Sequence, residues 1–293
     1  MNNWFRETEK LIHENGADSF FDLRYFACVD STNEVVKREA ARGAAEGLTV
    51  IGEEQTAGKG RRGRSWKSPA GESLYFSFLL KPSLPPQHIS LLTLVMGLSV
   101  AQAVRELYQL DAVIKWPNDI VIGQKKICGI LTEAIVPTAI VPAAIVPTAI
   151  APAAGDPARI GIVIGTGINV NNEAFPEELQ DRATSLRLEL GQEASRSAVL
   201  AQTLSCFRKN YEICLKTGDL AGLQDAYNAL LVSMNREVRI EDPRGPYTAV
   251  SRGIDAGGRL LVERKMTTET GTTVIPEAIS SGEVSVRGLY GYV

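Results

Sequence analysis

The alternation of hydrophobic and polar positions predicts strands and helices that do not follow a regular βαβ repeat. Short apolar or alternating runs predict strands, and longer runs with helical spacing predict helices. The predicted strands cover residues 20–29, 48–53, 74–80, 112–115, 120–122, 127–135 and 160–165. The predicted helices cover residues 4–15, 31–42, 88–109, 195–217 and 219–231. We therefore expect an α+β domain in which helices flank a mixed or antiparallel sheet.

The second of these helices has start and stop signals in its own sequence. Ser31-Thr32-Asn33-Glu34 matches a capping box, in which the first and last side chains satisfy free amides at a helix start. Gly43 supplies the residue type that commonly ends a helix in the left-handed conformation. We expect the helix to begin at this box and to end before Gly43.

The pattern of predicted elements changes near residue 235 and divides the chain into two parts. Beyond it, short β runs alternate with Gly and Pro turns, which is typical of a small all-β domain. We predict a large domain at residues 1–234 and an all-β domain at residues 235–293. A Pro- and Ala-rich insertion at residues 135–157 has proline at every fifth position, which favours an extended loop over a helix or a membrane span.

Composition narrows the class of protein. The 293 residues carry a net charge of −3, whereas a nucleic-acid-binding protein usually has a basic surplus, so we do not expect DNA binding. The four cysteines are dispersed and there are only two histidines, which argues against a zinc site and for reduced thiols in a cytoplasmic protein. The N-terminus has no signal-peptide pattern.

Residues 58–64, Gly-Lys-Gly-Arg-Arg-Gly-Arg, are the segment of the chain with the strongest indication of ligand binding, because they combine glycines with closely spaced cations. Their spacing fits G-x-G-x-x-G, but that dinucleotide motif needs a helix directly after it, and this chain continues into a predicted strand. A P-loop is excluded because Gly60 stands where that motif has Ser or Thr. Glycines allow close approach to a ligand, and arginine forks bind phosphate oxygens. We interpret the segment as a flexible loop that closes over a phosphate anhydride; a solvated basic turn is the alternative.

Three further segments place polar groups at predicted strand ends. In residues 115–119, Lys-Trp-Pro-Asn-Asp, the Asp119 carboxylate is suited to Mg²⁺ beside phosphates, with Lys115 balancing charge. Lys126 enters a buried strand, where its ammonium is suited to polarise a carboxyl oxygen. Two glycines before Asn169 leave room for a purine against the backbone. Taken alone, each segment also has a simpler explanation. The first and third would be ordinary turns, and the lysine pair at residues 125–126 would only keep a hairpin turn soluble.

Together and in this order, these segments resemble the biotin protein ligase family, in a short form without the family's N-terminal DNA-binding module. The resemblance rests on residues 30–33, 55–66, 115–119, 126–131 and 165–169, with weaker support from residues 282–285. It implies the fold shared by class II aminoacyl-tRNA synthetases and biotin and lipoate ligases, followed by a small C-terminal β-barrel. The large domain would then be the catalytic domain that binds biotin and ATP.

The resemblance also implies a site. Biotin would contact Ser31, Thr32, Asn33, Gln55, Lys59, Gly60, Arg61 and Lys126. The nucleotide would contact Gly58, Arg64, Trp66, Lys115, Asn118 and Asn169. Lys126, Arg61 and Lys59 would act in catalysis, and Asp119 would bind Mg²⁺. The implied reaction joins biotin to ATP as biotinyl-AMP and then transfers biotin to a lysine of a biotin carboxyl carrier protein.

Two features depart from the family pattern. Lys59 stands where arginine is commoner, so the positive charge is kept while the bidentate fork is lost. The proline repeat has no counterpart in the family, and we interpret it as a tolerated loop expansion. A lipoate ligase of the same architecture and a non-enzymatic biotin sensor or regulator are the alternative functions. Homodimerisation through a sheet edge is left open by the sequence.

Overall fold

The computed structural model describes residues 3–17, 19–63, 65–135, 160–268, 271–281 and 285–288. Most of the predicted insertion at residues 135–157, together with Arg64 and residues 282–284, therefore lies outside the described residues.

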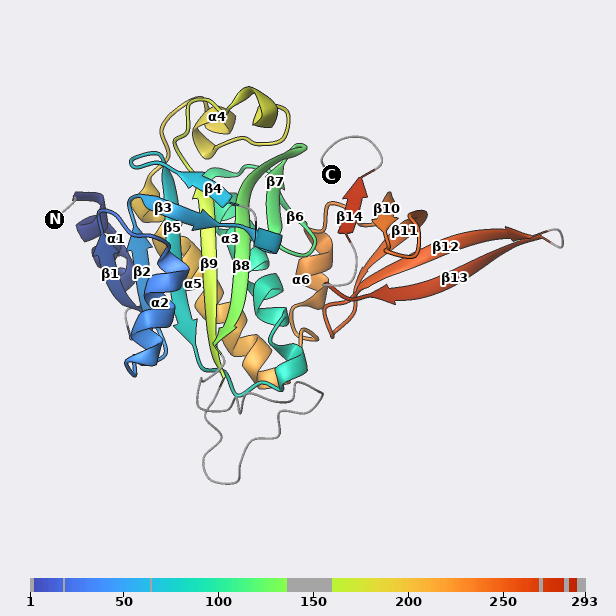
Figure 1. Cartoon of the computed structure of the whole chain (residues 1–293), viewed down its shortest axis with the longest axis horizontal. Helices are drawn as coiled ribbons and strands as arrows, with labels where there is room; N and C mark the ends of the chain where they lie inside the picture. The colour runs from blue at the N-terminus through green and yellow to red at the C-terminus, as the bar shows by residue number, and fades with distance from the viewer. Residues whose placement is uncertain are drawn as a thin grey trace.

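Seven strands form the central sheet, in the order β1-β2-β5-β9-β8-β7-β6 (Figure 1). β1 and β2 pair in parallel, and every other neighbouring pair is antiparallel, so the predicted mixed sheet is confirmed. The strands are β1 (Asp22–Phe26), β2 (Leu48–Gly52), β5 (Ser73–Leu80), β6 (Ala112–Lys115), β7 (Asp119–Ile122), β8 (Lys125–Ile135) and β9 (Gly161–Asn169).

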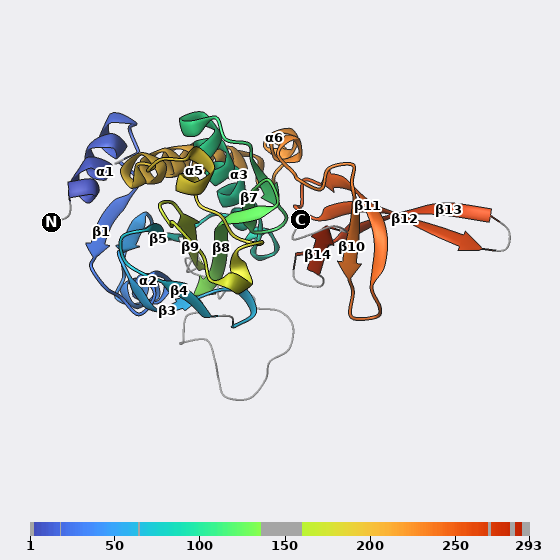
Figure 2. The same ribbon diagram turned by 90° about the horizontal axis from the view of Figure 1, so that it is seen from above.

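The sheet is the middle layer of the domain. Seen from above, helices α1 (Asn3–Glu14), α3 (Leu91–Tyr108) and α5 (Arg196–Thr217) lie on one side of it, and α2 (Thr32–Ala41) lies on the other (Figure 2). We call these the core face and the site face. On the core face the Phe78 and Phe207 rings pack with centroids 4.7 Å apart. On the site face, Val35 and Val36 of α2 pack with Leu79 and Val163.

Strand periodicity explains why the two faces differ. Along β5, Phe76 and Phe78 belong to the main core, whereas Tyr75 and Ser77 alternate with them and lie opposite glycines of β9 in the register. Directly opposed residues of an antiparallel pair point to the same face. The site face near α2 therefore has small and polar side chains, which leave space above the middle strands.

The apolar helix α3 is a core helix by its burial. The segment Pro86–Tyr108 is the one helix among the described residues that is long and apolar enough to cross a membrane by length and composition, and 67% of its 18-residue apolar window is buried inside the structure. Ser99 and Asn210 form a hydrogen bond of 3.0 Å between α3 and α5. Helices of this kind are common in the cores of soluble proteins.

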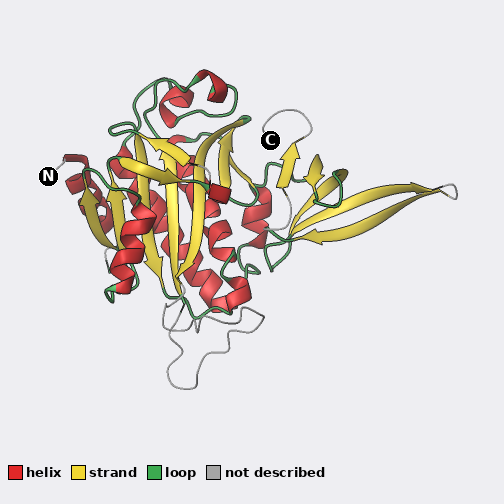
Figure 3. Cartoon of the chain, viewed as in Figure 1, coloured by secondary structure: helices red, strands yellow, loops and turns green. Residues whose placement is uncertain are grey.

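The C-terminal part forms a second, antiparallel sheet in the order β13-β12-β11-β10-β14, and the β12–β13 hairpin projects away from the body (Figures 1 and 3). Its strands are β10 (Glu237–Glu241), β11 (Tyr247–Ile254), β12 (Leu260–Thr268), β13 (Gly271–Ile279) and β14 (Ser285–Gly288). Trp116 Nε1 joins the sheets by donating to the Gly258 carbonyl at 3.1 Å. The all-β character is confirmed; closure into a barrel and the division at residue 235 stay predictions.

Several local predictions need correction. The glycine-rich segment is part of a hairpin, β3 (Gln55–Lys59) and β4 (Ser65–Ser68), with a 3₁₀ turn at Arg61–Gly63. Helices α4 (Leu186–Leu190) and α6 (Gln224–Ala229) differ from the prediction, since the first was missed and the second is shorter than predicted.

The capping box is also wrong. Ser31 is the N-cap, but its side chain makes no capping hydrogen bond. Glu34 instead binds the ammonium groups of Lys37 and Lys59. An ammonium attracts a carboxylate more strongly than a neutral amide does, so ion pairing takes precedence over capping here. The predicted stop is confirmed, because Gly43 has a φ of 93° directly after the helix.

Candidate active site

A cleft opens on the site face, between the first turn of α2, the β3–β4 hairpin and the middle strands. Segments far apart in the sequence contribute its walls. The lining residues are Ser31, Thr32, Asn33, Gln55, Lys59, Gly60, Arg61, Trp66, Tyr75, Asn118, Lys126, Ile127, Cys128, Gly129, Ile130, Leu131, Gly165, Thr166, Gly167 and Asn169.

Glycines form the floor of this cleft. Gly129 of β8 lies opposite Gly167 of β9, and Gly165 lies opposite Leu131 in the same register. A Cβ atom at Gly165 would stand 2.0 Å from Asn33 Oδ1, so no larger residue fits there while α2 keeps its place. The glycines thus let α2 approach the sheet and leave a shallow floor for a ligand.

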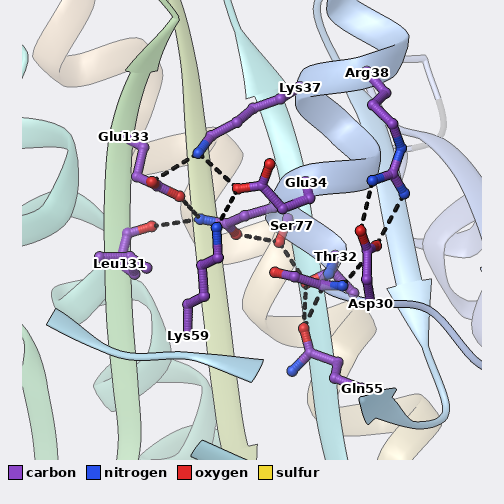
Figure 4. Close-up of polar contacts among 12 residues, drawn as sticks. Asp30, Thr32, Glu34, Lys37, Arg38, Gln55, Lys59, Ser77, Leu131 and Glu133 are labelled. Carbon is purple, nitrogen blue, oxygen red and sulfur yellow. Dashed lines mark hydrogen bonds and ion pairs between the residues drawn. The ribbon is translucent and has the colours of Figure 1, made fainter. Parts of the chain in front are cut away.

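The first turn of α2 presents a connected set of polar groups (Figure 4). Ser77 Oγ donates to Asn33 Oδ1 at 2.6 Å and lies 2.7 Å from Thr32 Oγ1. Gln55 Oε1 accepts from the backbone amide of Thr32 at 3.0 Å. Thr32, Asn33 and Ser77 are all buried, and buried polar groups of this kind are fixed in orientation by their hydrogen bonds. The turn therefore offers preorganised donors and acceptors to a polar ligand.

Lys126 brings a cation to the opposite wall. Its Nζ lies 2.6 Å from Asp119 Oδ1 and 5.6 Å from the centroid of the Trp66 ring. A Cβ atom at Gly129 would stand 2.8 Å from the same Nζ, so glycine provides the room through which the lysine side chain crosses the strand. The ammonium is only partly exposed, which strengthens its interaction with an anionic ligand.

Arg61 enters the cleft from the turn of the β3–β4 hairpin. Its Nη1 donates to Asn118 Oδ1 at 2.5 Å, and Asn118 Nδ2 in turn donates to the Ile130 carbonyl at 3.2 Å. The amide of Asn118 thus links the hairpin to the β7–β8 wall. Since Asn118 is neutral, this contact orients the guanidinium without neutralising its charge.

Lys59 stands at the rim on the other side. Its Nζ lies 2.7 Å from Glu34 Oε1, an atom that also accepts from Lys37 Nζ at 3.0 Å. Hydrogen bonding to Lys59, followed by that to Lys37, lowers the pKa of the Glu34 carboxyl from its ordinary value. Glu34 is therefore ionised at neutral pH and holds the hairpin by charge.

The structure brings most of the predicted site residues together. Residues lining the cleft are Ser31, Thr32, Asn33, Gln55, Lys59, Gly60, Arg61, Lys126, Trp66, Asn118 and Asn169. Gly58, Lys115 and Asp119 are described but are not part of its lining, and Arg64 lies outside the described residues. The ligand contacts of all these residues, inside and outside the lining, stay predictions.

Gly58 has a structural role in the hairpin. A Cβ atom there would stand 2.5 Å from the carbonyl oxygen of Trp66, which is backbone and cannot move aside easily. Asn169 also has a structural role, because its Nδ2 donates to the Thr184 carbonyl at 3.0 Å. Both residues therefore shape the site through its framework.

Sequence reasoning missed several residues of the site. Tyr75 lines the cleft, and Ser77, Lys37 and Glu133 orient its polar wall. A signal existed for Ser77, since a serine inside the apolar run of β5 marks a place where that strand faces something polar. Lys37 and Glu133 gave no signal, because they meet only through the fold.

A magnesium site built by protein groups alone is not supported within the described ranges. They contain no group of three or more His, Cys, Asp or Glu residues placed to hold a metal ion. The Asp119 oxygen proposed for the metal already lies beside the Lys126 ammonium. Magnesium commonly binds through one carboxylate plus substrate phosphates and water, so it would enter here with the nucleotide.

Comparison with known proteins agrees with this geometry. Residues 25–146 match the biotin/lipoate A/B protein ligase family, and residues 234–287 match the biotin protein ligase C-terminal domain. The bifunctional ligase/repressor BirA of Bacillus subtilis is 34% identical over 82% of this chain and 69% of its own length. The biotin–(acetyl-CoA-carboxylase) ligase of Mycobacterium tuberculosis is 31% identical over 89% of this chain and 88% of its own length.

A solved structure extends the likeness to three dimensions. The biotin protein ligase of Aquifex aeolicus, solved in complex with biotin and ATP, superposes with a TM-score of 0.69 at 30% identity, covering 91% of this chain and 99% of that one. The two family matches include α2, the β3–β4 hairpin and strands of both sheets. The chain therefore belongs to the biotin protein ligase family.

Proposed function

We propose that this chain is an ATP-dependent biotin ligase, which makes biotinyl-AMP and transfers biotin to a lysine of a biotin carboxyl carrier protein. One observation carries the proposal: a single cleft joins a polar turn, a glycine floor and three cationic side chains, Lys59, Arg61 and Lys126. The Aquifex relative that binds biotin and ATP, and the relatives named as ligases of acetyl-CoA carboxylase, support the choice of substrates.

The polar turn suits the ureido ring of biotin. That ring has two N–H donors and one carbonyl acceptor, and Ser31, Thr32 and Gln55 offer hydroxyl and amide groups that match both kinds. Asn33 and Ser77 fix this turn through hydrogen bonds, so the ring meets groups that need no reorganisation. Tyr75 and the glycine floor then provide apolar surface for the rest of the ligand.

The three cationic side chains would stabilise the negative charge that builds up on the reacting oxygens during adenylate formation. In the first step, a biotin carboxylate oxygen attacks the α-phosphorus of ATP, the bond to the β-phosphate oxygen breaks, and pyrophosphate leaves. Lys126 would contact the carboxyl or α-phosphoryl oxygen, with Arg61 and Lys59 completing the charge around the phosphate. Bound Mg²⁺ would neutralise phosphate charge. We place the nucleotide near Trp66 and Asn169, with Gly58, Arg64, Lys115 and Asn118 around it.

In the second step, the neutral ε-amine of the carrier lysine attacks the carbonyl carbon of the mixed anhydride. An amide forms, AMP leaves with the bonding electron pair, and the amine proton passes to solvent. Bringing the anhydride and the lysine together in one cleft supplies much of the rate. We also propose that the enzyme acts in the cytoplasm, which its four free cysteines support; homodimerisation and the lack of DNA binding stay predictions.

Arg61→Gly is expected to release the intermediate early. The substitution removes the guanidinium that spans from the hairpin to Asn118, so the hairpin loses its link to the opposite wall. Biotinyl-AMP should dissociate at least about tenfold faster, as expected for the loss of a charged hydrogen bond. Rapid gel filtration after a single turnover, followed by quantification of protein-bound adenylate, measures this. Retention equal to that of the unchanged enzyme would refute the role of the hairpin.

Gly129→Ala is expected to impair catalysis without unfolding the protein. The added Cβ would meet the end of the Lys126 side chain, which can swing away, so the fold is kept while the ammonium is displaced. A displacement of about 1 Å in an active site can cost about a hundredfold in rate. The turnover number should fall on that scale with an unchanged thermal melting curve. A normal turnover number would show that the position of Lys126 is unimportant.

Biotinylation of a purified carrier domain tests the function itself. Intact-mass analysis should show a single biotin adduct that requires ATP and biotin, and a carrier whose acceptor lysine is replaced by arginine should stay unmodified. The same architecture could serve a lipoate ligase, so lipoate replaces biotin in a parallel reaction. Modification by lipoate alone would overturn the proposal in favour of that alternative.

A further inference from the structure

Both ends of strand β3 are tied to the first turn of α2 (Figure 4). At its start, Gln55 Oε1 accepts from the amide and the hydroxyl of Thr32, at 3.0 and 3.2 Å. At its end, Lys59 Nζ lies 2.7 Å from Glu34 Oε1. The glycine-rich hairpin is therefore bound at both ends of β3 to the same helical turn that borders the ligand cleft.

Glu34 is fixed from its other side as well. Lys37 Nζ bridges Glu34 Oε1 and Glu133 Oε1 at 3.0 and 2.7 Å, and Glu133 Oε2 accepts from Asn33 Nδ2 at 2.6 Å. Ion pairs and hydrogen bonds thus run without a break from Lys59 to the buried Asn33. The Glu34 carboxylate therefore has a second cationic partner, Lys37, besides Lys59.

The Lys59 side chain is more exposed than its partner Glu34. Its side chain is 47% exposed, and that of Glu34 is 29% exposed, so water screens the pair and its contribution is small. A carboxylate or phosphate oxygen of a ligand in the cleft would compete with Glu34 for the same ammonium through a charge-assisted bond. An anionic ligand can therefore take Lys59 from Glu34.

We propose that Glu34 is a positioning residue for Lys59: before substrate binds, it holds the glycine-rich hairpin over the cleft, and it gives the lysine up when an anionic substrate binds. Naming biotin and ATP as those substrates rests on the function proposed above. Because the pair stabilises only the enzyme without bound substrate, it opposes substrate binding by the free energy that it contributes.

Glu34→Gln separates this role from a merely structural one. In the ligand-free enzyme, amide hydrogen exchange across residues 55–61 should rise about twofold to fivefold, the range that corresponds to an exposed ion pair. With biotin and ATP saturating, exchange should equal that of the unchanged enzyme. The apparent KM for biotin in pyrophosphate exchange should fall by a similar factor while kcat stays the same. General damage to the site would instead raise KM or lower kcat.

Two variants complete the test. Glu39→Gln removes a carboxylate from the same helix that pairs with Arg24 and Arg42, and it should change neither exchange nor KM. In a Lys59→Ala background, Glu34→Gln should have no further effect on hairpin exchange, because the partner is already gone. Unchanged exchange in Glu34→Gln alone, or a raised KM, would overturn the proposal. The ligand-free measurement needs no turnover, so it judges Glu34 even if the enzyme proves inactive with biotin.

Discussion

Replacing Lys126 with alanine lowers the turnover number for biotin-dependent pyrophosphate exchange by about a hundredfold to a thousandfold, the loss expected when one preorganised donor to a reacting oxygen is removed. The ammonium lies inside the cleft, and its side chain is 21% exposed, so bulk water cannot replace it fully. Its neighbour Asp119, 2.6 Å away, would keep a negative charge beside the substrate once the lysine is gone. The loss of the attraction between Lys126 and the substrate and the repulsion of the substrate by Asp119 both lower the turnover number.

The adjacent lysine supplies the matched control. Lys125 precedes Lys126 at the start of β8 but does not line the cleft, so Lys125→Ala should leave turnover within about twofold, as is usual for a surface change. Lys126→Arg keeps the charge with a different shape and should recover part of the activity. Equal activity of Lys126→Ala and Lys125→Ala would remove Lys126 from the mechanism.

The largest loss of stability is expected from Glu53→Ala, about 3–5 kcal/mol in the free energy of unfolding. Glu53 follows β2 and forms a partly buried ion pair with Arg196 of α5 at 2.7 Å, with side chains 11% and 13% exposed. It also accepts from Trp4, Tyr25 and the amide of Gly71. Its removal takes the carboxylate from the Arg196 guanidinium and the acceptor from these donors, which costs more than the pair contributes.

Urea unfolding at neutral pH measures this difference. Glu54→Ala, a change at the exposed neighbour, should alter the free energy of unfolding by no more than about 0.5 kcal/mol. A Glu53→Ala protein as stable as the Glu54→Ala protein would show that this carboxylate does not join α1, β1 and α5.

The same carboxylate sets an acid limit on the fold. Burial tends to raise the pKa of Glu53, but the Arg196 guanidinium together with the hydrogen bonds from Tyr25 and Trp4 outweighs it, so the pKa stands below the ordinary value of 4.5. A carboxyl with a lowered pKa contributes stability that is present above the unfolded-state pKa and is lost as pH falls through the folded-state pKa. Part of the acid destabilisation below pH 4.5 should therefore disappear in Glu53→Ala.

Periodicity was sufficient to predict most of the central sheet. The buried run of β5 and the apolar run of β2 follow simple strand patterns, and their predicted bounds differ from the observed ones by one residue at most. The cleft could also be predicted in part, because Lys126, Asn118 and Arg61 lie within motifs whose residue types suggest phosphate chemistry. These features are local in the sequence, so they could be predicted from it.

What escaped prediction depends on contacts between distant residues. The sequence of the β3–β4 hairpin has no apolar periodicity that would predict strands. The hairpin forms through backbone pairing of Gly58 and Lys59 with Trp66 and Ser65. The Asn33 and Glu133 side chains are 100 residues apart and meet only after the sheet forms. The capping box failed for the same reason, because Lys59 approaches Glu34 from another element.

Pyrophosphate exchange into ATP, measured with biotin and with lipoate under matched conditions, tests the central claim most directly. The proposed cleft predicts labelled ATP with biotin, none above background with lipoate, and a large loss of the biotin signal in Lys126→Ala. Exchange supported by lipoate alone, or a biotin signal that Lys126→Ala leaves unchanged, would contradict the assignment of this cleft to biotinyl-AMP formation.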